Sequence, residues 1–167
     1  MTTSVPLEEL LPHRPPMVLI DAVESFDAAT KHLVARVTIG PNQLFCTSDG
    51  VPNWVAIEYM AQTAAALVGF YDKVTAPGAP ARPGLLLGTR RLDLKLDRFE
   101  KGKTYFISAE NVFNDDEAAS FICSIQDAAG DTVATATLSA YRPPDIEQFI
   151  KEQVSWRYCC CSASGRR

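Results

Sequence analysis

The stretch from residue 53 to residue 71 contains one charged side chain, Glu58, among residues that are mostly apolar. A carboxylate without a partner in apolar surroundings costs several kcal/mol, so Glu58 needs a partner, water or a proton. Burial raises the pKa of a carboxyl group and makes it able to donate a proton near neutral pH. Gln62 follows one helical turn later and is placed to orient Glu58. The alternative is an exposed glutamate at the N-terminal end of a helix, where the helix dipole stabilises it.

Histidine is the most common general base, and the chain has two histidines. His13 lies in the run Leu11-Pro12-His13-Arg14-Pro15-Pro16-Met17, where prolines on both sides restrict the backbone. This elbow suits a histidine that must be held in place, although a loop histidine with no role fits the same pattern. His32 follows Lys31 at the edge of a turn without apolar surroundings, so we expect no role for it.

A basic stretch follows in a chain whose formal net charge is −4. Its members are Arg82, Arg90, Arg91, Lys95, Arg98, Lys101 and Lys103. These side chains either solvate one face of a strand or form a docking patch for an anionic carrier or a phosphopantetheine phosphate. The sequence has no glycine-rich phosphate loop, no metal-ligand spacing and no nucleophile elbow. We therefore expect neither a metal ion nor a cofactor.

One helix and a run of strands must position these residues. Pro52 precedes the clearest helix, residues 53–71, which is apolar nearly all round and is therefore expected to be buried on most of its surface. We expect strands at 17–26, 31–39, 84–99, 103–113, 118–126 and 132–142, a loop at 75–83, and a C-terminal helix at 145–154. This order predicts an α+β single domain over residues 1–154, with an unstructured tail at 155–167.

Composition limits the class of protein. The chain has 167 residues, of which 47% are hydrophobic and 22% charged, as in an ordinary soluble domain, and its acidic balance argues against nucleic acid as a partner. The run from Tyr59 to Tyr71 is too short to span a membrane, which takes roughly 20 residues. The N-terminus has no secretory pattern, so we expect a cytoplasmic protein with free thiols at Cys46 and Cys123. The run Cys159-Cys160-Cys161 belongs to the predicted tail, with acylation as an alternative role.

Two motifs resemble those of a known family. Leu11-Pro12-His13-Arg14-Pro15-Pro16-Met17-Val18-Leu19-Ile20-Asp21 resembles the opening motif of the bacterial 3-hydroxyacyl-acyl-carrier-protein dehydratases, and Ile57-Glu58-Tyr59-Met60-Ala61-Gln62 resembles their helix motif. Gly50-Val51-Pro52-Asn53-Trp54 and Leu86-Leu87-Gly88-Thr89-Arg90-Arg91 are similar to the aryl-polyene-type subgroup. The resemblance implies a hot-dog fold, in which a curved antiparallel sheet wraps around a long helix, and usually a dimer.

The resemblance also implies a reaction, elimination of water from a 3-hydroxyacyl thioester carried by an acyl carrier protein. Glu58 matches the acid of the family, and Gln62 matches its glutamine. The general-base histidine of the family lies in a loop before the helix, and here that loop reads Phe45-Cys46-Thr47-Ser48-Asp49-Gly50-Val51-Pro52. We therefore hypothesise that His13 removes the C2 proton while Glu58 protonates the leaving hydroxyl. The substrate-binding residues expected beside them are Gln62, Pro52, Asn53, Trp54, Val55, Gly88 and Arg90, with backbone N–H groups at the helix start polarising the thioester carbonyl.

Two other functions fit the same residues. A hot-dog thioesterase would need Glu58 alone, as base or nucleophile. A non-catalytic paralogue that pairs with an active dehydratase would explain the missing loop histidine. The expected partners are an acyl carrier protein and a second hot-dog subunit, either a copy of this chain or a relative.

Overall fold

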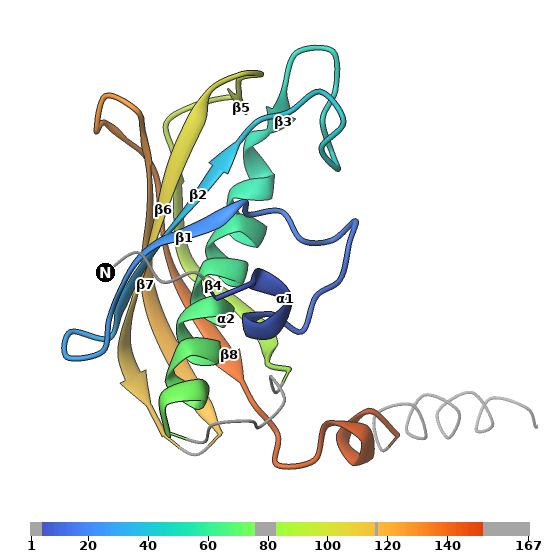
Figure 1. Ribbon diagram of the computed structural model, residues 1–167, viewed down its shortest axis with the longest axis vertical. Coiled ribbons are helices and arrows are strands. Elements are labelled where there is room, and N and C mark those ends of the chain that lie inside the picture. Colours follow the sequence, from blue (N-terminus) through green and yellow to red (C-terminus); the bar gives the residue numbers. More distant parts are fainter. Residues whose placement is uncertain (1–4, 76–82, 116, 152–167) are drawn as a thin grey trace, which may run out of the picture.

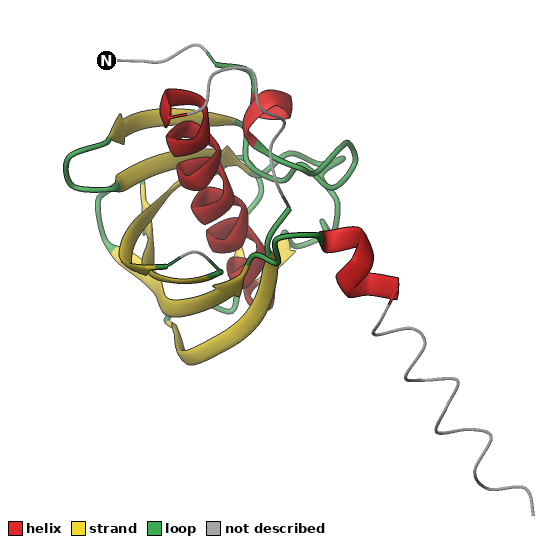
Figure 2. Ribbon diagram, turned by 90° about the horizontal axis from the view of Figure 1, so that it is seen from below, coloured by secondary structure: helices red, strands yellow, loops and turns green. Residues whose placement is uncertain are grey.

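The computed structural model describes residues 5–75, 83–115 and 117–151, and in it a curved antiparallel sheet wraps around one long helix (Figure 1). The helical segments are α1 Leu7–Leu10, the 3-10 turn η1 Asn53–Val55 and α2 Ala56–Thr75. The strands are β1 Ala22–Asp27, β2 His32–Thr38, β3 Val51–Pro52, β4 Leu85–Leu94, β5 Arg98–Phe99, β6 Thr104–Asn114, β7 Ala118–Asp127 and β8 Thr132–Tyr141. Viewed from below, α2 runs through the hollow of the curled sheet (Figure 2). This is the α+β hot-dog arrangement that the sequence predicted.

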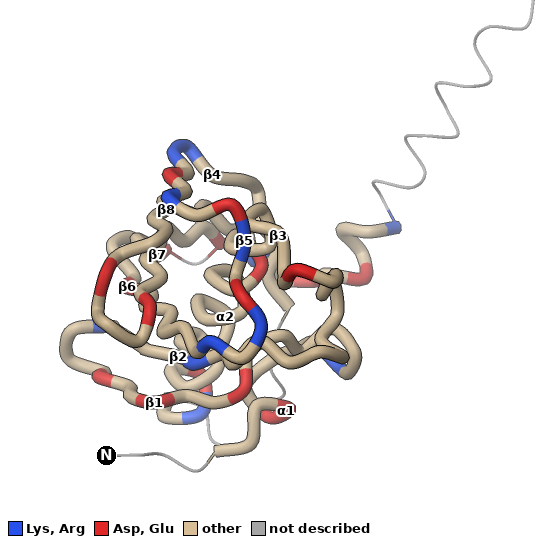
Figure 3. Tube along the Cα trace, turned by 90° about the horizontal axis from the view of Figure 1, so that it is seen from above, with Lys and Arg blue, Asp and Glu red and all other residues tan. Residues whose placement is uncertain are grey.

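The sheet has six strands in the order β1-β2-β6-β7-β8-β4, and each neighbouring pair is antiparallel. Alternate residues of each central strand face α2, as in β2, where Leu33, Ala35 and Val37 are buried. β3 and β5 form a separate two-stranded ladder. β4 lies at one edge of the main sheet, and Lys and Arg alternate with Asp along the chain from β4 to β5 (Figure 3).

The long helix is confirmed, with η1 preceding it and α2 extending to Thr75. It is buried on most of its surface, and Tyr59 packs edge-on against Phe99, which in turn packs against Tyr105. Within the described residues, no helix is long and apolar enough to cross a membrane.

Two predicted strands differ from the observed ones. The first begins at Ala22 rather than Met17, because the main chain of residues 17–19 bonds to a side chain of α2 instead of a neighbouring strand. The predicted strand 84–99 is two strands, β4 and β5. They separate because the carbonyls of Leu96 and Asp97 accept hydrogen bonds from Asn53 at the start of η1.

The C-terminal region is described in part. Residues 146–151 are helical, and Asp145 caps them by accepting a hydrogen bond from the backbone N–H of Gln148. The rest of the predicted C-terminal helix, the tail 155–167 and most of the predicted loop 75–83 lie outside the described residues.

Candidate active site

Gln62 joins Glu58 to the segment that precedes β1. Its side chain is fully buried in α2, and its Nε2 donates to Oε1 of Glu58 at 2.8 Å and to the carbonyl of Met17 at 2.6 Å. Its Oε1 accepts from the backbone N–H of Leu19 at 2.8 Å. Both ends of the amide are therefore used, and the Glu58 carboxylate is fixed through one oxygen. The predicted orienting role of Gln62 toward Glu58 fits this geometry.

The segment that carries His13 is anchored by packing on its N-terminal side. Leu10 and Leu11 are buried, and the backbone of Leu10 lies directly on Gly69 of α2. A Cβ at Gly69 would be 2.3 Å from the Leu10 carbonyl oxygen, so a side chain there would force the two segments apart. Arg14 then folds back and donates to the carbonyl of Leu11 at 3.0 Å and to that of His13 at 2.8 Å. These contacts hold the elbow against α2.

His13 and Glu58 meet in the folded chain. Nε2 of His13 is 3.8 Å from Oε1 of Glu58, and about one third of each side chain is exposed. This separation is too long for a hydrogen bond, yet it allows one atom between the two groups to contact both. Nδ1 of His13 is buried and has no hydrogen-bond partner among the described residues, so Nε2 is the ring nitrogen available for chemistry. Glu58 lies in the first turn of α2 and is half-buried. It is therefore both near the N-terminal end of the helix and partly shielded from solvent.

The pair opens into a cavity of about 850 Å³ between α2 and the sheet. Its lining includes Ala61 and Ala65 on α2, and Phe121 and Leu138 on β7 and β8. A cavity of this size, with both apolar and polar side chains in its lining, can hold a small molecule. The arrangement can place an acid and a base beside an apolar ligand.

The residues predicted at the helix start lie just before the turn that carries Glu58. The backbone N–H of Asn53 donates to the carbonyl of Asp97 at 3.3 Å, so the fold already uses this donor. Val55 is buried, whereas Trp54 is 57% exposed and packs edge-on against Phe45, with ring centroids 5.4 Å apart. Pro52 forms part of β3.

The predicted residues on β4 lie apart from the pair. Gly88 and Arg90 do not line the cavity that contains His13 and Glu58. Arg90 is exposed and lines a separate hollow with Leu87. In the single chain, a contact of Gly88 or Arg90 with substrate would have to be made outside this cavity, although Leu85 and Leu86 at the start of β4 do line it.

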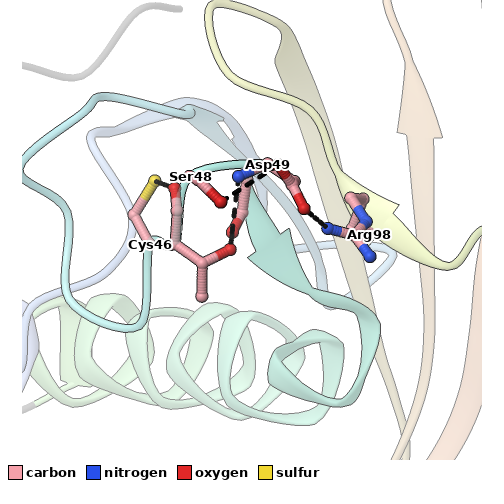
Figure 4. Close-up of polar contacts among 6 residues, drawn as sticks. Cys46, Ser48, Asp49 and Arg98 are labelled. Atoms are coloured by element: carbon pink, nitrogen blue, oxygen red, sulfur yellow. Dashed lines mark hydrogen bonds and ion pairs between the residues drawn. The ribbon is translucent and has the colours of Figure 1, made fainter.

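The loop that should carry the family's histidine is held by its own polar contacts (Figure 4). Oγ1 of Thr47 donates to the carbonyl of Gly50 at 2.8 Å, and Asp49 accepts from Arg98 of β5 at 2.8 Å. A Cβ at Gly50 would be 2.2 Å from the Phe99 carbonyl oxygen, so the loop lies tightly on β5. The ion pair between Asp49 and Arg98 was not predicted from the sequence.

Both described cysteines are free thiols, as predicted. Cys123 is buried on β7, and burial raises the pKa of its thiol to about 12. A thiol in this state is unreactive near neutral pH, so Cys123 belongs to the core.

Comparisons with known proteins agree with the fold. A family model described as ApeP-like, ApeP dehydratase, matches residues 5–151. The dehydratase heterocomplex ApeI:P from Xenorhabdus doucetiae has a chain that is 28% identical, with a TM-score of 0.81, and the match covers 89% of this chain and 97% of that one. No curated protein matches.

More distant structures share the fold alone. A homologue of HP0420 from Helicobacter felis is 12% identical with a TM-score of 0.62, over 84% of this chain and 92% of that one. The smu.793 protein from Streptococcus mutans, solved with acetyl CoA, is 12% identical with a TM-score of 0.57, over 80% of this chain and 95% of that one. The family match spans nearly the whole described chain, and the chain belongs to the ApeP-like family of hot-dog dehydratases.

Proposed function

We propose that this protein eliminates water from a 3-hydroxyacyl thioester on an acyl carrier protein and releases the trans-2-enoyl thioester. The observation that carries the proposal is the pair of His13 and Glu58, 3.8 Å apart at the mouth of an apolar cavity. Elimination needs a base at C2 and an acid at the C3 hydroxyl of one substrate, and two groups at this distance can both reach it.

In this reaction, Nε2 of His13 takes the C2 proton, and the electron pair of that C–H bond becomes the C2–C3 double bond. The C3–O bond breaks, and Glu58 protonates the departing hydroxyl to give water. Return of the proton from His13 to Glu58, directly or through one water, restores the starting state. Gln62 holds Oε1 of Glu58 through the cycle. Backbone N–H groups after Asn53 at the helix start polarise the thioester carbonyl.

The proposed macromolecular partners are a second hot-dog subunit and the acyl carrier protein. β4 is a ten-residue edge strand with exposed Leu86 and Leu87, a surface that folded proteins usually cover or pair. The similar Xenorhabdus structure is a heterocomplex, which supports a related rather than identical partner. Arg90 on β4 and Lys95 directly after it are exposed and offer positive charge to an acidic carrier.

The test is turnover of a 3-hydroxyacyl carrier thioester by the protein alone and in the presence of a related hot-dog subunit. We expect His13→Ala and Glu58→Gln each to lower kcat by about 10²-fold or more, and His32→Ala, the matched control, to leave it unchanged. Wild-type turnover by His13→Ala would contradict the assignment of His13 as the general base.

The same assay separates the two other functions. Release of a free thiol from the thioester would identify a thioesterase instead, because dehydration leaves the thioester intact. A complex whose turnover survives both the His13 and the Glu58 substitution would identify this chain as a non-catalytic partner.

A further inference from the structure

The side of α2 that faces the cavity carries small side chains beyond Glu58. Half-buried residues that line the cavity follow one another at helical spacing, and we call them the cavity stripe: Glu58, Ala61, Ala65, Val68 and Asp72. Asp72 is 14 residues after Glu58, which corresponds to about 21 Å along the helix axis at about 1.5 Å per residue. The cavity is therefore elongated, and it extends from the proposed acid and base toward the C-terminal end of α2.

The opposite wall of this cavity belongs to the same chain. Phe121 of β7 and Leu138 of β8 are inward-facing residues, 3% and 1% exposed, and both line the cavity. The cavity has a volume of about 850 Å³ and follows α2 for about 21 Å. A single hydrocarbon chain fits it.

The far end of the cavity is polar. Arg142, after β8, makes a two-pronged ion pair with Asp72, with N–O distances of 3.1 and 3.3 Å, and both residues line the cavity. Between the reacting pair and this ion pair, α2 contributes Ala61, Ala65 and Val68 to the lining. A ligand with its reacting carbon beside Glu58 has room for a long apolar extension in one direction.

We propose that Ala61 and Ala65 are the residues that set acyl chain length, and that they admit substrates with long acyl chains along α2. The inference rests on the proposed dehydration. An extended hydrocarbon advances by about 1.25 Å per carbon, given a C–C bond of about 1.5 Å. With C3 beside Glu58, the axial rise of about 4.5 Å places Ala61 level with about the seventh carbon, and about 10.5 Å places Ala65 level with about the eleventh. The distance to Asp72 corresponds to about seventeen further carbons.

The test is a comparison of 3-hydroxyacyl thioesters with four, ten and sixteen carbons. Ala65→Leu should lower kcat/KM for the sixteen-carbon substrate by at least tenfold and leave the two shorter ones within about twofold. Ala61→Leu should lower both the ten- and the sixteen-carbon values and spare the four-carbon one. Losing the burial of two or three methylene groups is enough for a tenfold effect. Val74→Phe is the control, because Val74 is 66% exposed on α2 and does not line the cavity.

The decisive result is that the acyl chain length at which kcat/KM falls differs between Ala61→Leu and Ala65→Leu. Equal losses for all three chain lengths, or no loss in either leucine variant, would overturn the role of the two alanines. Dissociation of the complex by Ala65→Leu, measured by size-exclusion chromatography, would also overturn it and assign the cavity to a partner subunit.

A binding measurement separates this inference from the proposed reaction. We expect the full chain to bind cis-parinaric acid, a fluorescent eighteen-carbon fatty acid, and both leucine variants to bind it at least tenfold more weakly. If the wild-type protein dehydrates none of the thioesters but shows this binding pattern, the proposed reaction is contradicted and the proposed acyl-binding role of the cavity is supported. Equal binding by wild type and variants overturns the channel, whatever the activity.

Discussion

Replacing Gln62 with methionine tests whether one buried amide both stabilises the fold and positions the catalytic carboxylate. Methionine has nearly the same shape, but it cannot replace the donors and the acceptor of the amide. The N–H of Leu19, which is buried, and the partly buried carbonyl of Met17 would both lose their partner. Each unsatisfied group costs about 1–3 kcal/mol, so we expect Gln62→Met to lower the free energy of unfolding by about 2–4 kcal/mol. For a domain of this size, Tm should fall by on the order of 10 °C.

The Gln62→Met variant should also lose activity under conditions where it is fully folded, so that unfolding does not account for the loss. Oε1 of Glu58 loses its hydrogen bond from Gln62, so kcat should drop by about 10- to 100-fold at a temperature where the variant is fully folded. The measurements are urea unfolding followed by circular dichroism, and dehydration of a 3-hydroxyacyl thioester under the same conditions.

The matched control for this variant is Thr63→Val. Thr63 is equally buried on α2, but its hydroxyl donates only to the Tyr59 carbonyl at 2.8 Å, one turn back in the same helix. We expect this control to lose no more than about 1 kcal/mol and to keep its kcat, because no other buried group depends on the hydroxyl. A Gln62→Met protein within about 1 kcal/mol of wild type, with unchanged kcat, would refute both roles of the amide.

Two more predictions concern the packing around the site. Gly69→Ala should destabilise the protein by more than about 2 kcal/mol and lower activity, because its Cβ would meet the carbonyl of Leu10 and displace the segment that carries His13. Gly40→Ala, whose Cβ would meet nothing within 4 Å, is the control, and equal unfolding free energies for the two variants would contradict the close packing. Iodoacetamide at pH 8 should leave Cys123 unmodified in the folded protein, since burial raises the pKa of its thiol to about 12, and should label the half-exposed Cys46. Peptide mass spectrometry measures both thiols, and rapid labelling of Cys123 would show that β7 opens.

Local pattern was enough to predict the elements whose burial follows a regular period. The alternation of residues 31–39 predicted β2 to within one residue at each end, because every second side chain of that strand points into the core. The mostly apolar run after Asn53 predicted α2 for the same reason, since a helix enclosed by a sheet must be apolar on nearly all sides. The run from Met17 to Ile20 has the same apolar character and still is not a strand. Its main-chain groups bond to Gln62, more than 40 residues away, and no local pattern contains that partner.

The residues of the candidate site were visible in the sequence, but their geometry was not. His13 and Glu58 are far apart along the chain, and they meet because Leu10 packs on Gly69 and because Gln62 reaches the backbone of Met17. The cavity beside them was not predicted, because it depends on the curvature that brings β7 and β8 around α2. Motif similarity alone also grouped Gly88 and Arg90 with the site, although strand β4 carries them to a separate surface of the single chain.

The position of the histidine has a physical consequence for the reaction. In this chain the loop from residue 45 to residue 50 is tied to β5 by the ion pair of Asp49 with Arg98, and none of its side chains is a histidine. The segment before β1, which carries the proposed base His13, is anchored by the same side chain as the proposed acid, because Gln62 bonds both to Met17 and to Glu58. A displacement of that segment therefore disturbs both groups together. It follows that substitutions at Gln62 should affect the proton transfers of His13 and Glu58 jointly. A double variant of Gln62 and His13 should therefore lose less activity than the product of the two single losses, because part of the Gln62 effect acts through His13.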